Sequence, residues 1–163
     1  MAALRYNVID PGACERTYSS VYKDQSCGSN NAAPTLSSNH AWTAKNAAAG
    51  EWMTMDAGSL MEIHGVRTKV KDDGSRRQWI TQFTVDYSTD NATWSSVDGG
   101  AIFLGPPPAP PPPDIEAATD AVFASPVSAR YIRITAQAFA GWVAIRAGLL
   151  SSEFSCAAVP VND

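Results

Sequence analysis

Short runs of alternating apolar and polar residues, separated by turn-forming residues, constrain the fold of this chain more than any other feature. The clearest run is residues 80–88, in which Phe83, Val85 and Tyr87 alternate with polar side chains. Because successive side chains of a β-strand point to opposite faces, this run predicts an antiparallel strand with one apolar and one solvated face. Helical periodicity is almost absent. The pattern therefore predicts an all-β sandwich or barrel.

Other strand-like segments recur along the chain. They are residues 51–57, 63–70, 131–135 and 142–150. In 131–135, Ile132 and Ile134 share one face, and the two isoleucines are expected to face the 80–88 stripe across the core. In 142–150 the alternation puts Ile145 on the core face and Arg146 on the opposite one. These segments predict the inner faces of a two-layer sandwich.

A turn-forming cluster at residues 89–92 separates the 80–88 strand from residues 93–95. This arrangement predicts a hairpin in which Trp94 returns toward the core. Asn91-Ala92-Thr93 is also an N-glycosylation sequon on an exposed turn. Asn91 has two interpretations, because asparagine is a turn-forming residue whether or not it carries a glycan.

Size and charge limit the classes of protein to which the chain can belong. The 163 residues are enough for one domain, and 45% of them are hydrophobic and 17% charged, as in ordinary globular proteins. The formal net charge of −4 argues against nucleic acid and anionic lipid as main partners. Residues 1–11 lack a continuous apolar stretch, so we expect a cytoplasmic or cytoskeletal location, with unconventional export as the alternative.

The three cysteines, Cys14, Cys27 and Cys156, do not match the spacing of a zinc site. A bridge between Cys14 and Cys156 would close most of the chain into one loop and stabilise it. In a reducing cytosol, free buried thiols are the alternative. Both interpretations stay open at the level of sequence.

A proline-rich segment, residues 105–114, interrupts the strand pattern. Proline cannot donate to a sheet ladder, so the segment is predicted to form an exposed polyproline II excursion between strands. It would serve either as a ligand for an aromatic-lined groove on a partner protein or as a tolerated loop expansion with no partner.

Six segments in order carry a resemblance to a known family. They are Trp42, residues 51–58, residues 78–83, Tyr87-Ser88-Thr89-Asp90-Asn91-Ala92-Thr93-Trp94, Ala129-Arg130-Tyr131-Ile132-Arg133-Ile134 and Val143-Ala144-Ile145-Arg146. Together they resemble the discoidin, or factor V/VIII type C, family, and most of all the N-terminal domain of discoidin lectins. The resemblance implies an eight-stranded antiparallel jelly roll over residues 14–156, with an extension at 1–13 and a tail at 157–163.

By this resemblance, loops at one end of the jelly roll bind glycans, phospholipid head groups or proteins. The expected loops are the segment after Ser20, residues 71–78 and residues 137–142. A sugar site needs an aromatic face and polar groups that orient hydroxyls. The candidate ligand-binding residues are Phe139, Trp142, Asn39, His40, Asp72, Asp73, Arg76 and Arg77. The alternative for Trp142 is a covering of the core, and for His40 a histidine satisfied beside Trp42.

Two departures from the family pattern bear on ligands. Residues 71–77 offer no apolar anchor, so membrane binding is not expected. Sugar-binding relatives hold a structural calcium ion through a Glu two positions after the closing Arg, and here that position is Gly148. The resemblance therefore predicts no cofactor, because one hard oxygen ligand is missing.

No catalytic motif is present in the sequence. The serine pairs lack a nucleophile-elbow context, and Asp72 and Asp73 lie in a loop with no element to hold both carboxylates toward one bond. We expect a non-catalytic, lectin-like carbohydrate-binding module, which self-association would strengthen by multivalency. The alternative is an intracellular module that docks on a partner protein in a larger cytoskeletal or ciliary assembly.

Overall fold

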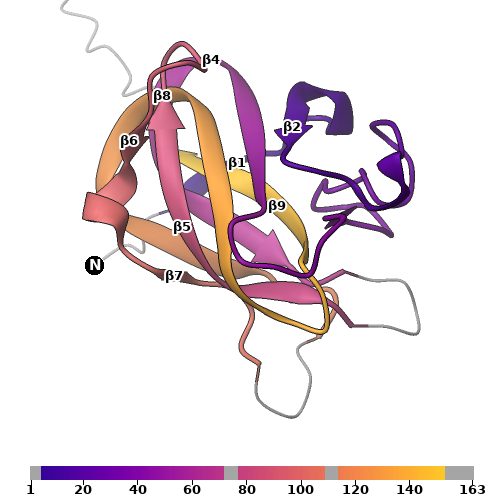
Figure 1. Ribbon diagram of the computed structural model, residues 1–163. Helices are drawn as coiled ribbons and strands as arrows, with labels where there is room; N and C mark the ends of the chain where they lie inside the picture. Colours follow the sequence, from indigo (N-terminus) through magenta and orange to yellow (C-terminus); the bar gives the residue numbers. More distant parts are fainter. Residues whose placement is uncertain (1–4, 72–76, 109–113, 153–163) are drawn as a thin grey trace, which may run out of the picture.

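The computed structural model describes residues 5–71, 77–108 and 114–152, which form nine β-strands and three short 3₁₀ turns (Figure 1). The elements are β1 Tyr6–Ile9, η1 Ala13–Glu15, β2 Arg16–Tyr18, η2 Tyr22–Asp24, β3 Trp42–Thr43, β4 Trp52–Lys69, β5 Trp79–Ser88, β6 Ser95–Ser96, η3 Val97–Gly100, β7 Phe103–Leu104, β8 Thr119–Ala140 and β9 Ala144–Ser152. The predicted all-β class is confirmed. No helix within these ranges is long and apolar enough to cross a bilayer.

Two long strands, β4 and β8, run through both layers of the antiparallel jelly roll. The first half of β4, residues 52–56, pairs with residues 131–135 of β8, whereas its second half pairs with the beginning of β8 and with β9. The register shifts between Asp56 and Met61 and again between Ile63 and Gly65. Irregular pairing of this kind bends a strand, so β4 and β8 curl from one layer into the other (Figure 1).

The predicted apolar stripes form the core. Phe83, Val85, Ile132 and Ile134 have no exposed surface, and Tyr87 packs against them from a partly buried position. The same alternation places Arg133 on the outer face of β8. The stripes therefore line the core as predicted, but they do not face each other across the sandwich. They lie on neighbouring strands of one layer, with Val85 opposite Ile134 and Tyr87 opposite Ile132.

The prediction that Trp94 returns to the core is wrong. Its ring lies 4.2 Å from the guanidinium carbon of Arg133, and the ring of Trp52 lies 3.9 Å from the same atom. Arg133 also donates to Thr54 Oγ1. Trp94 thus covers the outer face of the sheet, because a cation held between two aromatic rings gives it a partner there.

Arg146 is on the outer face of β9 as predicted, but it is 1% exposed. Residues 34–42 run alongside β9, with the Ala147 N–H donating to the Pro34 carbonyl oxygen and Trp42 opposite Ile145. The Arg146 guanidinium donates to the carbonyl oxygens of Leu36, Ser38 and Val70. Backbone carbonyls replace water around this charge, which is the condition for burying it.

The domain limits differ from those expected at the N-terminal side. Residues 1–13 were predicted to be an extension, yet β1 pairs with β9, with Tyr6 opposite Ser152 and Ile9 opposite Leu149. This strand belongs to the sheet. The predicted tail at 157–163 lies outside the described residues.

The start of the proline-rich segment is packed, not exposed as predicted. Gly105 and Pro106 are buried, and Trp79 Nε1 donates to the Pro106 carbonyl oxygen at 2.8 Å. An indole N–H that is buried needs an acceptor, and this carbonyl supplies it. Pro107 and Pro108 are exposed, and residues 109–113 lie outside the described ranges.

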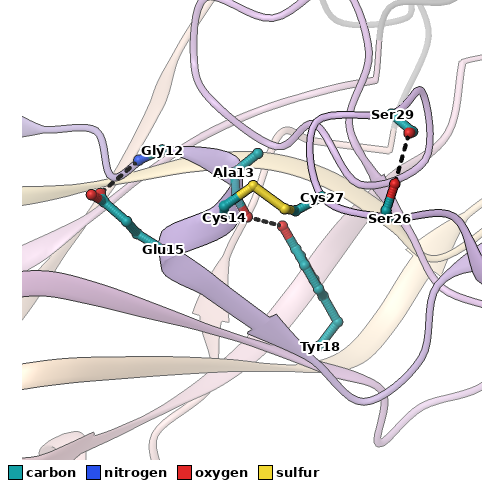
Figure 2. Close-up of a disulfide and its surroundings, with 8 residues drawn as sticks. All are labelled: Gly12, Ala13, Cys14, Glu15, Tyr18, Ser26, Cys27 and Ser29. Carbon is teal, nitrogen blue, oxygen red and sulfur yellow. Dashed lines mark hydrogen bonds between the residues drawn. A yellow bond between two sulfur atoms is a disulfide. The ribbon is translucent and has the colours of Figure 1, made fainter.

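Cys14 pairs with Cys27, with their Cα atoms 5.1 Å apart (Figure 2). Both alternatives considered from the sequence for Cys14, a bridge to Cys156 and a free thiol, are therefore wrong. The chain after β2 folds back on η1, which brings two cysteines 13 positions apart together. Beneath the bridge, Tyr18 donates its hydroxyl to the Ala13 carbonyl oxygen, and burial raises the pKa of Tyr18 to about 12. Cys156 lies outside the described residues.

Candidate functional site

One end of the sandwich, here called the rim, is formed by residues 19–25, 44–51, 77–78 and 140–142. The strands fix these loops beside each other. Trp79 pairs with Ala140, and Lys71 N–H donates to the Gln78 carbonyl oxygen. The end of β8 and the start of β5 therefore bring residues 77–78 next to residues 140–142.

An aromatic pair lies at the rim. Trp142 is half-buried, and its Nε1 donates to the Ala44 carbonyl oxygen at 2.8 Å. The ring of Tyr22, in η2, lies edge-on to the Trp142 ring, with 6.1 Å between centroids and 78° between planes. Tyr22 is 40% exposed. The two rings together give the rim an aromatic surface that water can reach.

The turn that carries Trp142 requires glycine at position 141. Gly141 has φ +72°, and a Cβ there would lie 3.0 Å from the Arg77 carbonyl oxygen and 3.3 Å from Gln78 Cγ. Only glycine combines this backbone conformation with so close an approach. The turn thereby sets the main chain of Arg77 directly against the segment that presents Trp142.

A single carboxylate, Glu51, ties two rim loops together. It accepts hydrogen bonds from the hydroxyls of Ser19 and Ser20 and from Asn46 Nδ2, the last at 3.1 Å. Burial raises the pKa of the Glu51 carboxyl, but these three hydrogen bonds outweigh burial and leave its pKa below the ordinary value. Glu51 is therefore a charged brace for the loops on either side of the aromatic pair.

Charged side chains flank the aromatic pair. Lys45 Nζ lies 2.7 Å from Asp24 Oδ1, with the two side chains 50% and 75% exposed. Lys23 Nζ lies 5.8 Å from the centroid of the Tyr22 ring. The rim thus combines aromatic surface with exposed donors and acceptors, which is the composition of a site for polar ligands that carry an apolar face.

The structure brings two of the candidate site residues together, Trp142 and Arg77, the latter exposed. Phe139 packs against the core from a partly buried position. Asn39 and His40 lie in the segment that runs alongside β9, where His40 N–H donates to Ser38 Oγ. Asp72, Asp73 and Arg76 lie outside the described residues.

Sequence reasoning missed the rim residues Tyr22, Lys45, Asn46 and Glu51. Their contacts join residues that are 5 to 120 positions apart in the chain, as Asn46 to Glu51 and Tyr22 to Trp142 illustrate.

The residues around Gly148 do not fit a structural calcium ion. A Cβ at Gly148 would meet Leu36 Cδ1 at 2.7 Å and the Ile9 carbonyl oxygen at 3.1 Å, so position 148 has no room for a carboxylate. Across residues 5–71, 77–108 and 114–152, no three His, Cys, Asp or Glu side chains gather as metal ligands would.

Comparisons with known proteins agree with this architecture. The bovine (Bos taurus) lactadherin is 31% identical over 116 residues, which is 68% of this chain and 26% of lactadherin. Coagulation factor VIII of the pig (Sus scrofa) is 26% identical over 128 residues, 76% of this chain and 6% of factor VIII. The chain thus spans about a quarter or less of these relatives.

Solved structures share the fold at low sequence identity. Discoidin II of Dictyostelium discoideum has a TM-score of 0.59 and 17% identity, covering 93% of this chain and 56% of discoidin II. The family 32 carbohydrate-binding module of NanJ from C. perfringens also has a TM-score of 0.59 and 17% identity. The match covers 90% of this chain and 100% of the module. The sequence profile of the F5/8 type C domain matches residues 16–149. The chain belongs to the F5/8 type C domain family.

Proposed function

We propose that this domain is a non-catalytic carbohydrate-binding module that holds a sugar at the rim. The observation that carries the proposal is the aromatic pair, Trp142 with the exposed Tyr22, at the end of the sandwich where the loops meet. The apolar side of a pyranose ring packs on an aromatic surface of this kind, while its hydroxyls need hydrogen-bond partners.

Polar groups that can meet hydroxyls surround the pair. Glu51 and Asn46 belong to one rim loop, and Lys45 and Asp24 form an exposed ion pair beside it. The main-chain carbonyl of Arg77 lies against the Gly141 turn, and the residue is exposed. Carboxylate, amide and guanidinium groups form directional hydrogen bonds with hydroxyls, and these give selectivity between sugars.

Structural neighbours support the same class of ligand. The NanJ module was solved with galactose, another C. perfringens module, CpGH89CBM32-5, with GalNAc-β-1,3-galactose, and the AlyQ module with an unsaturated mannuronic acid. Their identities to this chain are 15% to 21%, and their TM-scores are 0.54 to 0.60. Sugar recognition by these proteins is the reason for choosing galactose and N-acetylgalactosamine as first probes.

Titration of the full chain with galactose and N-acetylgalactosamine, followed by a glycan array, tests the proposal. We expect saturable binding at millimolar sugar. Trp142→Ala should weaken it by about thirtyfold, since truncating a central aromatic anchor costs about 2 kcal/mol. Trp142→Phe, which keeps an aromatic face but loses the N–H to Ala44, is the matched control and should retain most of the affinity.

Two results would contradict the proposal. One is the absence of saturable binding to every glycan on the array. The other is an affinity that Trp142→Ala leaves unchanged. A native protein that purifies in a stoichiometric complex and ignores sugar would instead support docking on a partner protein.

A further inference from the structure

The turn between β5 and β6 contains the one N-glycosylation sequon of the chain, Asn91-Ala92-Thr93. All three residues are exposed. A folded domain accommodates an N-linked glycan where the asparagine of the sequon lies on a surface loop. This turn meets that condition.

Other residues hold the turn together. Ser88 Oγ accepts from the main-chain N–H groups of Asp90 and Asn91, and Asp90 Oδ1 accepts from those of Ala92 and Thr93 at 2.9 and 2.8 Å. Asn91 has φ 60°, a conformation that asparagine tolerates and glycine would equally allow. The backbone conformation of the turn therefore explains an Asn at position 91. The hydrogen bonds that hold the turn use the main-chain N–H of Thr93 and not its hydroxyl, so the turn does not explain a Thr at position 93.

A hollow of about 220 Å³ opens beside Asn91. Its lining residues come from η1, β2, β4, β8 and the turn itself. They are Cys14, Glu15, Arg16, Thr17, Thr54, Asp56, Asn91 and Tyr131. Hydroxyl groups and one aromatic ring line the space, so a sugar attached to Asn91 would find polar partners there instead of a packed surface.

The disulfide is an independent observation that points to the same cellular route. Cys14 and Cys27 are joined, and Cys14 lies on the wall of this hollow. Disulfides persist in oxidising compartments such as the lumen of the endoplasmic reticulum and are rare in the cytosol. N-linked glycans are attached to secreted proteins at sequons in surface loops.

We propose that Asn91 carries an N-linked glycan, acquired on a secretory route. In the transfer step, Asn91 Nδ2 forms a bond to C1 of the first sugar and loses a proton. The bond from C1 to the pyrophosphate oxygen of a lipid-linked oligosaccharide donor breaks, and the lipid pyrophosphate leaves. This route would place the domain outside the cytosol, in contrast to the cytoplasmic location expected from the sequence.

The glycan would not obstruct the rim. β5 starts at the rim, where Trp79 pairs with Ala140, and ends at Ser88, just before the sequon. Ten residues of strand separate the two ends by about 30 Å. The proposal is thus independent of carbohydrate binding, and each can fail without the other.

Mass spectrometry of the protein purified from its native source tests the proposal. We expect a glycopeptide at Asn91, in which an N-glycan amidase removes the glycan and leaves aspartate in place of the asparagine. A non-reducing peptide map should contain the Cys14–Cys27 bridge. In a eukaryotic host that secretes the full chain, Thr93→Ala should abolish the glycan. Thr93→Ser, which preserves the sequon, should retain it.

Native protein with unmodified Asn91 would overturn the proposal, as would a glycan that persists in Thr93→Ala. Sugar titration of the Thr93→Ala protein should give the same affinity as the parent chain. A changed affinity would contradict the separation of the sequon from the rim.

Discussion

The rim and the opposite end, where β5 turns into β6, are stabilised in different ways. The β5–β6 turn is held by Ser88 and Asp90, which bond to main-chain groups at most three positions away. The rim is held by contacts across the chain, such as Glu51 to Ser20 and Trp142 to Ala44. Local sequence is therefore enough to specify the turn, whereas the rim exists only once the whole sandwich has formed.

The Cys14–Cys27 disulfide closes the segment that places Tyr22 at the rim. Loss of this disulfide should change stability more than any other substitution considered at the two ends. Cys14→Ser with Cys27→Ser should lower the free energy of unfolding by about 3 kcal/mol, because the unfolded chain is no longer closed into a loop across 13 positions. Urea denaturation of the oxidised parent and the double variant measures this difference.

Reducing the parent protein supplies the control for that experiment. Reduced parent and double variant should unfold at the same urea concentration if the bridge accounts for the loss. A Cys27→Ser variant as stable as the oxidised parent would contradict the Cys14–Cys27 pairing.

The two ends also contain residues with positive φ, Gly141 and Asn91, which respond differently to substitution. Gly141→Ala should cost about 1 to 2 kcal/mol, since an L side chain is strained at φ +72° and its Cβ would lie 3.0 Å from the Arg77 carbonyl oxygen. It should also weaken sugar binding by displacing Trp142. Asn91→Gly should change stability by only a few tenths of a kcal/mol, because glycine adopts φ 60° freely.

Thermal unfolding and sugar titration of both variants, made without the glycan, separate these effects. Equal losses of stability for Gly141→Ala and Asn91→Gly would show that the close approach at Arg77 does not matter. Retention of full sugar affinity in Gly141→Ala would show that the turn does not position Trp142.

The same contrast explains which parts of the fold could be predicted from sequence. The stripes of Phe83 with Val85 and of Ile132 with Ile134 depend on alternation within single strands, so they were predictable. Alternation also put Arg146 on the correct face, but it carries no information on what covers that face, here residues 34–42.

The errors have long-range causes. Three cysteines allow three pairings, and the return of the chain to η1, which sequence does not reveal, selects Cys27 for Cys14. The sequence predicts Trp94 in the core because a large apolar side chain is usually buried. In the structure, Arg133 and Trp52 give it partners on the outer face instead. The family resemblance predicted that Trp142 lies at the ligand-binding end of the sandwich. The places of Tyr22 and Glu51 at that end follow only from the folded loops, which bring Tyr22 to Trp142 and Glu51 to Ser20.

The smallest effect concerns the carboxylates at the two ends, Glu51 and Asp90, whose pKa values both lie below the ordinary ones. Burial raises the pKa of Glu51, but hydrogen bonds from Ser19, Asn46 and Ser20 together lower it by more. Main-chain N–H groups of Thr93 and Ala92 lower the pKa of Asp90. A carboxyl that is more acidic when folded stabilises the protein above its unfolded pKa. That stabilisation is lost as pH falls through the folded pKa.

Glu51 should therefore support the rim fully above pH 4.5, its ordinary value, and progressively less below it. Sugar affinity should fall over the same interval, because protonated Glu51 cannot accept from both serines and Asn46. In Glu51→Gln, which keeps the shape and removes the charge, the fall with pH should flatten and the affinity at neutral pH should be modestly lower. Asp90→Asn should leave sugar affinity unchanged at every pH, since the turn lies at the far end of β5. Parallel pH profiles for Glu51→Gln and the parent chain would refute the role of Glu51 as a charged brace.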